Sequence, residues 1–343
     1  MFVRHTVIYI VLVLLFVVCF VLVLLVGNIH IPIKNIFQIL FTGESAVEEW
    51  GTIIREFRLP KAITSVLAGI SLSVSGLQMQ TVFRNPLAGP YVLGISAGAS
   101  LGVAILVMGV SGMAIFSNTG VVGNWMIVIA AFLGASAVLF LIFSVSLRIK
   151  DVMTILILGI MFGSITSSLI NVLQYFTNES LLKSFTTWTM GSIHGVTVSQ
   201  LKVLVPCVFI GVLVALLSVK SLNAMLLGEN YARSLGVNII SSRLLIFFST
   251  GILAGSVTAF CGPIGFVGIA VPHICRMLFR TADQRTLLLA CILVGSIVMM
   301  MCDLIASFPG KGVVLPINSV TAFIGIPIII WIIVRNHKMS SMI

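Results

Sequence analysis

Charged side chains are scarce in this chain. Nineteen Lys and Arg and nine Asp and Glu make up 8% of its 343 residues, whereas soluble domains carry about 25%. Hydrophobic residues make up 59%, and the mean hydropathy is +1.23. These values exclude an ordinary soluble domain and place the chain in a lipid bilayer. The formal net charge of +10 then reflects membrane topology and contact with anionic lipid, and no nucleic acid partner is needed to explain it.

Motifs for nucleotide binding and covalent catalysis are also missing. The Gly-Lys pair at Gly310 and Lys311 has Ile305 where a phosphate-binding loop needs its first glycine. The sequence contains neither a GxSxG elbow nor an HExxH pair. We therefore predict that the chain is not an enzyme, has no catalytic residues and binds no cofactor of its own.

Metal-binding and disulfide patterns are absent from the sequence as well. Its six cysteines lie in or at the edge of apolar segments, without CxxC spacing, so we interpret them as small buried hydrophobic residues. His194 and His273 are each isolated in the sequence, and a packing role is favoured over a ligand role for both. No metal site is predicted.

Long apolar runs are what the chain does contain. A spanning helix needs roughly 20 mostly apolar residues, and about ten runs approach this length. They cover residues 6–26, 62–82, 91–110, 125–147, 152–173, 200–219, 243–259, 264–279, 286–306 and 315–334. We predict an all-α polytopic membrane protein with about ten transmembrane helices in a single domain, residues 1–343.

The distribution of Lys and Arg predicts the orientation. If the N-terminus is cytoplasmic, about twelve basic groups lie inside and about seven outside, where most of the Glu residues also lie. Both termini are therefore expected in the cytoplasm.

Asp303 is the carboxylate that falls within an apolar run. Burying an acid in the membrane costs on the order of 2.5–3.5 kcal/mol, so it is a candidate for a functional role. It could instead cap or cross-link helices, and this structural reading is favoured. An ion-coupled carrier would carry a set of such charges, and here the set is nearly empty.

A polar segment, residues 221–241, interrupts the apolar pattern. Glu229 lies four residues before Arg233, a spacing that stabilises a short helix by about 0.2–0.5 kcal/mol. Gly228 permits a tight turn before it. The segment either contacts a soluble partner or lies along the lipid headgroups, and the sequence alone allows both.

Several motifs resemble one family, the FecCD-type permeases of ABC importers for iron siderophores, haem and cobalamin. They are, in chain order, RLPK (58–61), SGLQMQTVFRNPLAGPYVLGISAGASLG (75–102), LGENYARSLGV (227–237), CGPIGFVGIAVPHICR (261–276) and LPINSVTAFIGIPIIIW (315–331). The resemblance implies the type II importer fold, with ten helices in each of two permease subunits. It also implies a cytoplasmic ATPase dimer and an extracytoplasmic substrate-binding protein, which is often a lipoprotein.

The resemblance further implies roles for particular residues. The ATPase-coupling set is Leu226, Leu227, Gly228, Glu229, Tyr231, Arg233, Leu235 and Gly236. The binding-protein docking set is Arg55, Arg58, Lys61 and Lys311. The translocation-path set is Thr154, Ser164, Ser167, Ser168 and Asn171. The family pattern AD-x-x-AR is replaced here by CDLIAS, which ends in Ser307, and Lys311 is the candidate substitute for its missing cation.

We therefore predict a multi-pass permease subunit of the cytoplasmic membrane that imports a ferric siderophore. Haem or cobalamin is the alternative cargo within the family, and an ion-coupled secondary carrier is the rival class. A homodimer and a heterodimer with a similar permease both remain open.

Overall fold

The computed structural model describes residues 2–27, 29–42, 47–109, 120–149, 151–308 and 314–340, which form helices and connecting turns without a β-strand. The helices of the first half are α1 (Phe2–Leu25), α2 (Ile33–Phe41), α3 (Glu48–Thr52), the π-helical turn η1 (Ile53–Arg58), α4 (Leu59–Val82), the 3-10 turn η2 (Pro90–Leu93), α5 (Ile95–Ala104), the π-helical turn η3 (Ile105–Gly109) and α6 (Gly120–Arg148). Those of the second half are α7 (Val152–Tyr175), α8 (Glu179–Thr189), α9 (Val198–Leu226), α10 (Glu229–Ser234), α11 (Ile239–Cys261), α12 (Val267–Phe279), α13 (Gln284–Ala306) and α14 (Ile317–Ser340).

Each of the ten predicted spans corresponds to an apolar helix. Seven helical segments within the described residues are long and apolar enough to cross a membrane, and three shorter apolar helices cover Ile95–Gly109, Val267–Phe279 and Ile317–Trp331. The prediction of an all-helical polytopic fold is confirmed. The short helices α2, α8 and α10 come in addition, between the spans.

Polar caps explain where several spans begin. The Asp151 carboxylate accepts hydrogen bonds from the first backbone amides of α7, and Asp283 does the same for α13. Thr197 and Gln200 form a capping box at the start of α9. These side chains satisfy amides that the helix itself leaves without acceptors, so the polar breaks between apolar runs are also helix start signals.

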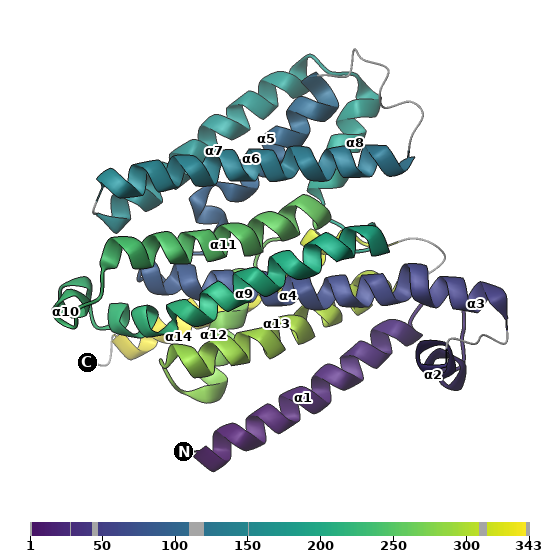
Figure 1. Ribbon diagram of the computed structural model, residues 1–343, viewed down its shortest axis with the longest axis horizontal. Coiled ribbons are helices and arrows are strands. Elements are labelled where there is room, and N and C mark those ends of the chain that lie inside the picture. The colour runs from purple at the N-terminus through teal and green to yellow at the C-terminus, as the bar shows by residue number, and fades with distance from the viewer. Residues whose placement is uncertain are drawn as a thin grey trace.

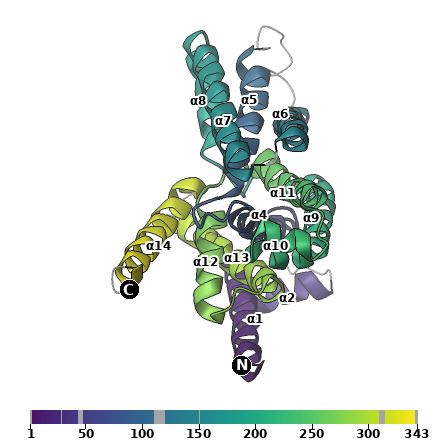
Figure 2. The same cartoon turned by 90° about the vertical axis from the view of Figure 1, so that its left-hand side faces the viewer.

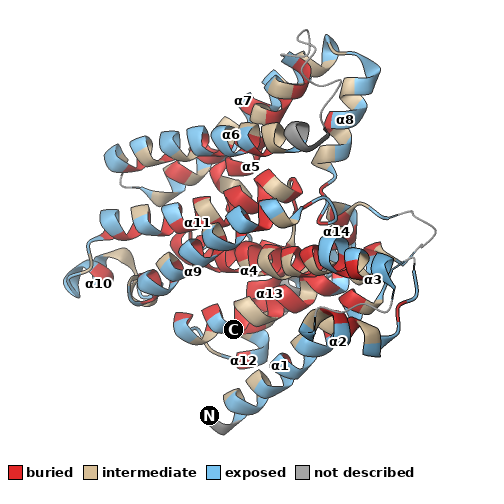
Figure 3. Cartoon of the chain, turned by 45° about the vertical axis from the view of Figure 1, so that its right-hand side comes forward, coloured by how far each residue is buried: buried red, intermediate tan, exposed pale blue. Residues whose placement is uncertain are grey.

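Helix α4 lies at the centre of the bundle and packs against α9, α11, α12 and α13. Helices α5, α6, α7 and α8 form a second group beside α11 (Figures 1 and 2). Figure 3 shows buried residues concentrated along α4 and α13 and exposed residues along α1 and α7. Helix α1 lies at the edge of the bundle, packs mainly against α13 and leaves most of its surface exposed.

Paired small residues bring α4 into close contact with its neighbours. A Cβ on Gly69 would lie 2.2 Å from the carbonyl oxygen of Gly295, and a Cβ on Gly76 would lie 1.8 Å from that of Gly268. Such distances leave no room for a side chain, so the backbones of α13 and α12 touch α4 directly.

Replacing Gly76 with Ala is expected to lower the stability of the detergent-solubilised protein by about 1–3 kcal/mol, because α4 and α12 must separate to admit the methyl group. The matched control is Gly163→Ala on α7, where the nearest atom to an added Cβ is 4.0 Å away. Thermal unfolding followed by circular dichroism compares the two. Equal midpoints for both variants would contradict the close packing described here.

Candidate functional site

The predicted coupling segment forms a hairpin of helices at one end of the bundle. Helix α9 ends at Leu226, the six-residue α10 follows, and α11 begins at Ile239. Figure 1 shows α10 at the same end of the molecule as the start of α1 and the end of α14. Four large apolar side chains on α10 and on the residues that flank it are exposed, by 41% for Leu226, 67% for Leu227, 51% for Tyr231 and 59% for Leu235. This surface, defined by these four residues, is here called the coupling face.

Backbone geometry fixes the orientation of α10. Gly228 (φ +119°) makes the turn that precedes it, and Gly236 (φ +81°) ends it. The amides of Gly236 and Val237 bond back to the carbonyls of Arg233 and Ala232, at 2.9 and 3.0 Å. This is a Schellman motif, which requires a residue with positive φ and so favours glycine there.

An ion pair ties α10 to α11. Glu229 is bound by Arg243, a side chain of α11 with 3% exposure. The sequence spacing suggested that Glu229 would assist Arg233 in stabilising the helix, but the salt bridge in the structure is with Arg243. Arg243 was missed because its partner is 14 residues away, beyond the reach of a helical spacing rule.

A cleft of about 590 Å³ separates the coupling segment from the first turn of α7. Its lining includes Asp151 and Met153 at the start of α7, the segment from Leu227 to Tyr231, and Arg84, whose guanidinium donates to the carbonyl of Met225 at 3.3 Å. The hydroxyl of Thr154 donates to Asp151 at 2.6 Å, and this bond lowers the pKa of the Asp151 carboxyl. The coupling segment and the predicted path helix thus face the same cleft.

The path residues predicted on α7 fall on one exposed stripe, with one qualification. Ser164, Ser167, Ser168 and Asn171 are exposed, and they are three or four residues apart, which aligns them along the helix. Thr154 is half-buried, and its hydroxyl donates a hydrogen bond to Asp151, the residue that caps the start of α7. The stripe is flanked by exposed apolar side chains, namely Ile157, Ile160, Met161, Ile165, Leu169 and Val172.

At the other end of the bundle, Arg58 is buried and bound by carbonyls. It is 5% exposed, and its guanidinium donates to the carbonyls of Leu24 (2.8 Å) and Leu25 (3.0 Å) and to that of Ile29. These bonds join η1 to the end of α1. Arg55 is exposed, and Lys311 lies outside the described residues.

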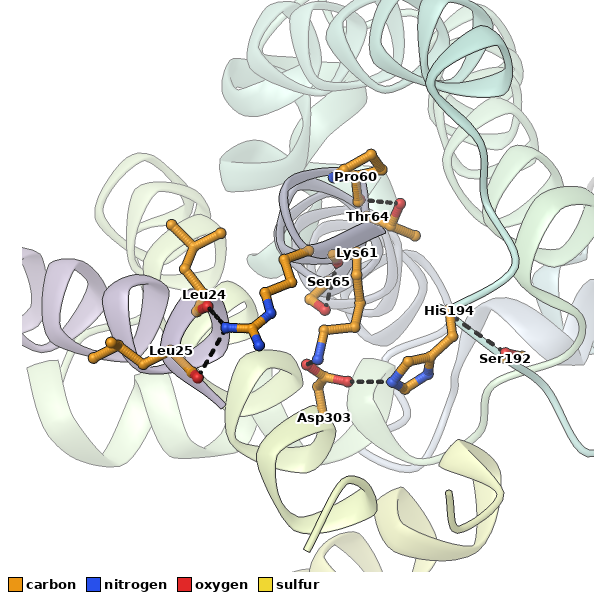
Figure 4. A network of polar contacts seen from close by, with 10 residues as sticks. Leu24, Leu25, Pro60, Lys61, Thr64, Ser65, Ser192, His194 and Asp303 are labelled. Atoms are coloured by element: carbon orange, nitrogen blue, oxygen red, sulfur yellow. Dashed lines mark hydrogen bonds and ion pairs between the residues drawn. The ribbon is translucent and has the colours of Figure 1, made fainter. Parts of the chain in front are cut away.

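Lys61 makes an ion pair with Asp303. The two atoms Nζ and Oδ2 are 3.0 Å apart, and Nε2 of His194 lies 3.4 Å from the other carboxylate oxygen, Oδ1 (Figure 4). Asp303 is 0% exposed and Lys61 is 7% exposed. The favoured structural reading of Asp303 agrees with this geometry, because a buried carboxylate needs a paired cation.

A pocket of about 830 Å³ opens beside this ion pair and is called here the outer pocket. Its lining includes the three basic side chains Arg58, Lys61 and His194. The remaining walls are mainly apolar and come from α1, η1, the end of α13 and Val314. His194 was missed by sequence reasoning, because nothing in the local sequence places the loop after α8 next to α13.

His273 is a buried side chain of α12 that contacts the backbone of another segment. Its Nε2 is 2.8 Å from the carbonyl oxygen of Pro86. Within the described residues, no three His, Cys, Asp or Glu side chains are grouped in a way that could hold a metal ion.

Comparisons with known proteins agree over nearly the whole chain. The FecCD transport family matches residues 14–335. The chain is 34% identical over 295 residues to the vitamin B12 import system permease protein BtuC of Klebsiella pneumoniae, covering 86% of each. It is 33% identical over 285 residues to the hemin transport system permease protein HmuU of Yersinia pestis, covering 83% of this chain and 84% of that protein.

A solved structure shows the same fold. A metal-chelate type ABC transporter in an inward-facing conformation superposes with a TM-score of 0.83 at 27% sequence identity, covering 96% of this chain and 99% of that one. The chain therefore belongs to the FecCD transport family and is a multi-pass permease subunit of an ABC importer in the plasma membrane, with the ATPase on a separate partner.

Proposed function

We propose that this permease imports iron as a ferric siderophore. The observation that carries the proposal is the exposed stripe on α7, whose hydroxyl and amide groups can hydrogen-bond a polar chelate but form no metal site among the described residues. A path without metal ligands suits a metal that arrives already chelated. Weak, dispersed contacts also allow release, because tight binding would slow passage.

Haem or cobalamin is the second candidate cargo. Two of the relatives are named for hemin and vitamin B12 transport, and both molecules are bulky metal chelates. The same exposed stripe on α7 would accept their polar edges, while its flanking apolar residues would contact their rings.

The coupling face is proposed to dock on the ATPase. It presents four large apolar side chains, Tyr231 on α10 and three on the residues that flank this short helix, which is held by glycine turns and by the Glu229–Arg243 pair. A rigid helix with an exposed apolar surface can transmit motion from a partner, since packed contacts shift as units. Both termini share this end of the molecule, and we assign it to the cytoplasm.

The outer pocket is proposed to receive an acidic group of the binding protein. Arg58 and Lys61 line it at the opposite end from α10, and Arg55 adds an exposed cation nearby on η1. Lys311 is retained as a candidate from the sequence. Basic groups at such a surface accelerate encounter with an acidic partner.

A second permease subunit, identical or similar to this one, is proposed to cover α7. Only 17% of the residues in the apolar stretch of this helix are buried by the rest of the chain. A polar stripe on such an exposed helix is better placed against another protein surface than against lipid. Two such stripes facing each other would enclose a path lined by hydroxyls and amides.

Uptake measurements test the cargo. Cells lacking this permease are supplied with radiolabelled ferric siderophores, haem or cobalamin, with and without the restored gene. Restored uptake of a ferric siderophore is expected. If the restored gene supports uptake of haem or cobalamin alone, the cargo is the second candidate and the ferric siderophore is rejected.

A further inference from the structure

Asp303 has two basic neighbours of different kinds. Its carboxylate is 0% exposed and has no conventional hydrogen-bond donor among the described residues. Its ionic contacts are Lys61 on one oxygen and His194 on the other. Because a buried carboxylate without a cation is strongly unfavourable, a change at Lys61 must be felt at His194.

The two basic side chains belong to different parts of the molecule. Lys61 lies in the first turn of α4 and lines the outer pocket, with 7% of its surface exposed. His194 lies in the loop between α8 and α9, and its side chain is 30% exposed, so water can supply it with a proton. Figure 4 shows both side chains pointing at Asp303 from separate segments.

The loop that carries His194 is fastened to the bundle by backbone bonds. The Ser192 amide donates to the carbonyl of Cys261 at 2.7 Å, and the Asn318 amide donates to that of Met190 at 3.3 Å. Helix α8 ends directly before this loop and follows α7 after a short turn. A displacement of His194 therefore acts on the last residues of α8, and the first residues of α8 adjoin the end of the path helix α7.

We propose that Asp303 is a counter-ion shared by the outer pocket and the α8–α9 loop, so that capture of Lys61 by a partner carboxylate transfers the pairing of Asp303 to a protonated His194. The inference rests on the proposed docking at Lys61 and adds a positioning role for His194 and Asp303. His194 takes its proton from water, and Lys61 keeps its own. The α8–α9 loop is thereby drawn towards α13 when the partner docks.

The surroundings of His194 suit this exchange. Burial lowers its pKa, the Asp303 carboxylate raises it, and the Lys61 ammonium lowers it. Arg58 lines the same pocket and adds a further positive charge. Removing Lys61 takes away one of the two influences that lower the pKa of His194, so the imidazole binds a proton at a higher pH than it does while the ammonium is in place.

Lys61→Met reproduces the loss of Lys61 in the purified permease without any partner. Its thermal midpoint is expected to fall by about 5 °C or more relative to the native protein at pH 8, and to recover most of that loss at pH 5.5. The sign follows from linkage. In the native protein the folded pKa of His194 is lowered, so this histidine costs stability as the pH falls below its unfolded pKa, near 6.5. Without Lys61 the folded pKa is higher, the cost at pH 5.5 is smaller, and the variant moves closer to the native protein.

Two further variants isolate His194. Adding His194→Gln to Lys61→Met should abolish the recovery at pH 5.5, whereas adding His30→Gln, which changes an exposed histidine, should leave it intact. If Lys61→Met fails to fold, His194→Gln alone should speed hydrogen exchange in residues 190–197 about tenfold.

Recovery that persists without His194 would overturn the proposal, as would unchanged exchange in residues 190–197 of His194→Gln. Both measurements use the isolated permease in detergent or nanodiscs. An error in the proposed cargo or docking surface would therefore not change either result. The proposed function and the shared counter-ion can thus be rejected independently of each other.

Discussion

Replacing both Leu227 and Tyr231 with Asp is expected to abolish uptake while the permease still folds. Both side chains are more than half exposed, so the folded chain loses little. In contact with the ATPase they would be apolar anchors, and residues of this kind can each contribute about 2 kcal/mol or more to an interface. Two carboxylates at these positions should weaken ATPase binding by at least about 100-fold.

Co-purification of the ATPase with the tagged permease measures this effect directly. Ser234→Asp is the matched control, because it adds a negative charge to the same short helix at an exposed position outside the coupling face. It should retain the ATPase. If the double variant also retains it, the coupling face is not the docking surface.

Reversing the charge of Glu229 is expected to have the second largest effect. Glu229→Arg places a second guanidinium beside Arg243, whose side chain is 3% exposed. Breaking a fully buried ion pair costs about 3–5 kcal/mol, and because Glu229 is 30% exposed we expect a smaller cost here. Detachment of α10 from α11 would relieve the repulsion between the two guanidinium groups. Uptake is expected to fall at least about tenfold, because the coupling face loses its fixed orientation.

The compensating variant distinguishes this pair from general damage. Glu229→Arg combined with Arg243→Glu restores opposite charges and should recover a large part of the uptake. Glu49→Arg, which reverses an exposed acid on α3, should leave uptake unchanged. If the paired reversal is no better than Glu229→Arg alone, the ion pair does not hold the coupling segment.

The helical architecture was predictable because lipid imposes a simple rule on the sequence. Spanning segments must be apolar and satisfy their own backbone hydrogen bonds, so hydropathy located the seven spanning helices and the three shorter apolar helices of the described residues. The short helices α2 and α8 were not marked. Each is too short to span and carries polar residues, and hydropathy over a spanning length does not detect such segments.

The candidate sites were predicted unevenly. The coupling segment could be predicted from its local sequence, because a polar segment with spaced Leu and Tyr residues stands out in an apolar chain. The contacts of Asp303 could not, because Lys61 and His194 lie far from it in sequence. Arg58 was expected at the surface, but the structure buries it against the end of α1, a contact that no local pattern reports.

ATP dependence of uptake in proteoliposomes tests the central claim most directly. The permease is reconstituted with its ATPase and binding protein, and entry of a radiolabelled ferric siderophore is followed with ATP, without ATP, and with an imposed proton or sodium gradient. Uptake that requires hydrolysable ATP and ignores both gradients is the predicted result. Uptake driven by a gradient without ATP would contradict the account and support an ion-coupled carrier.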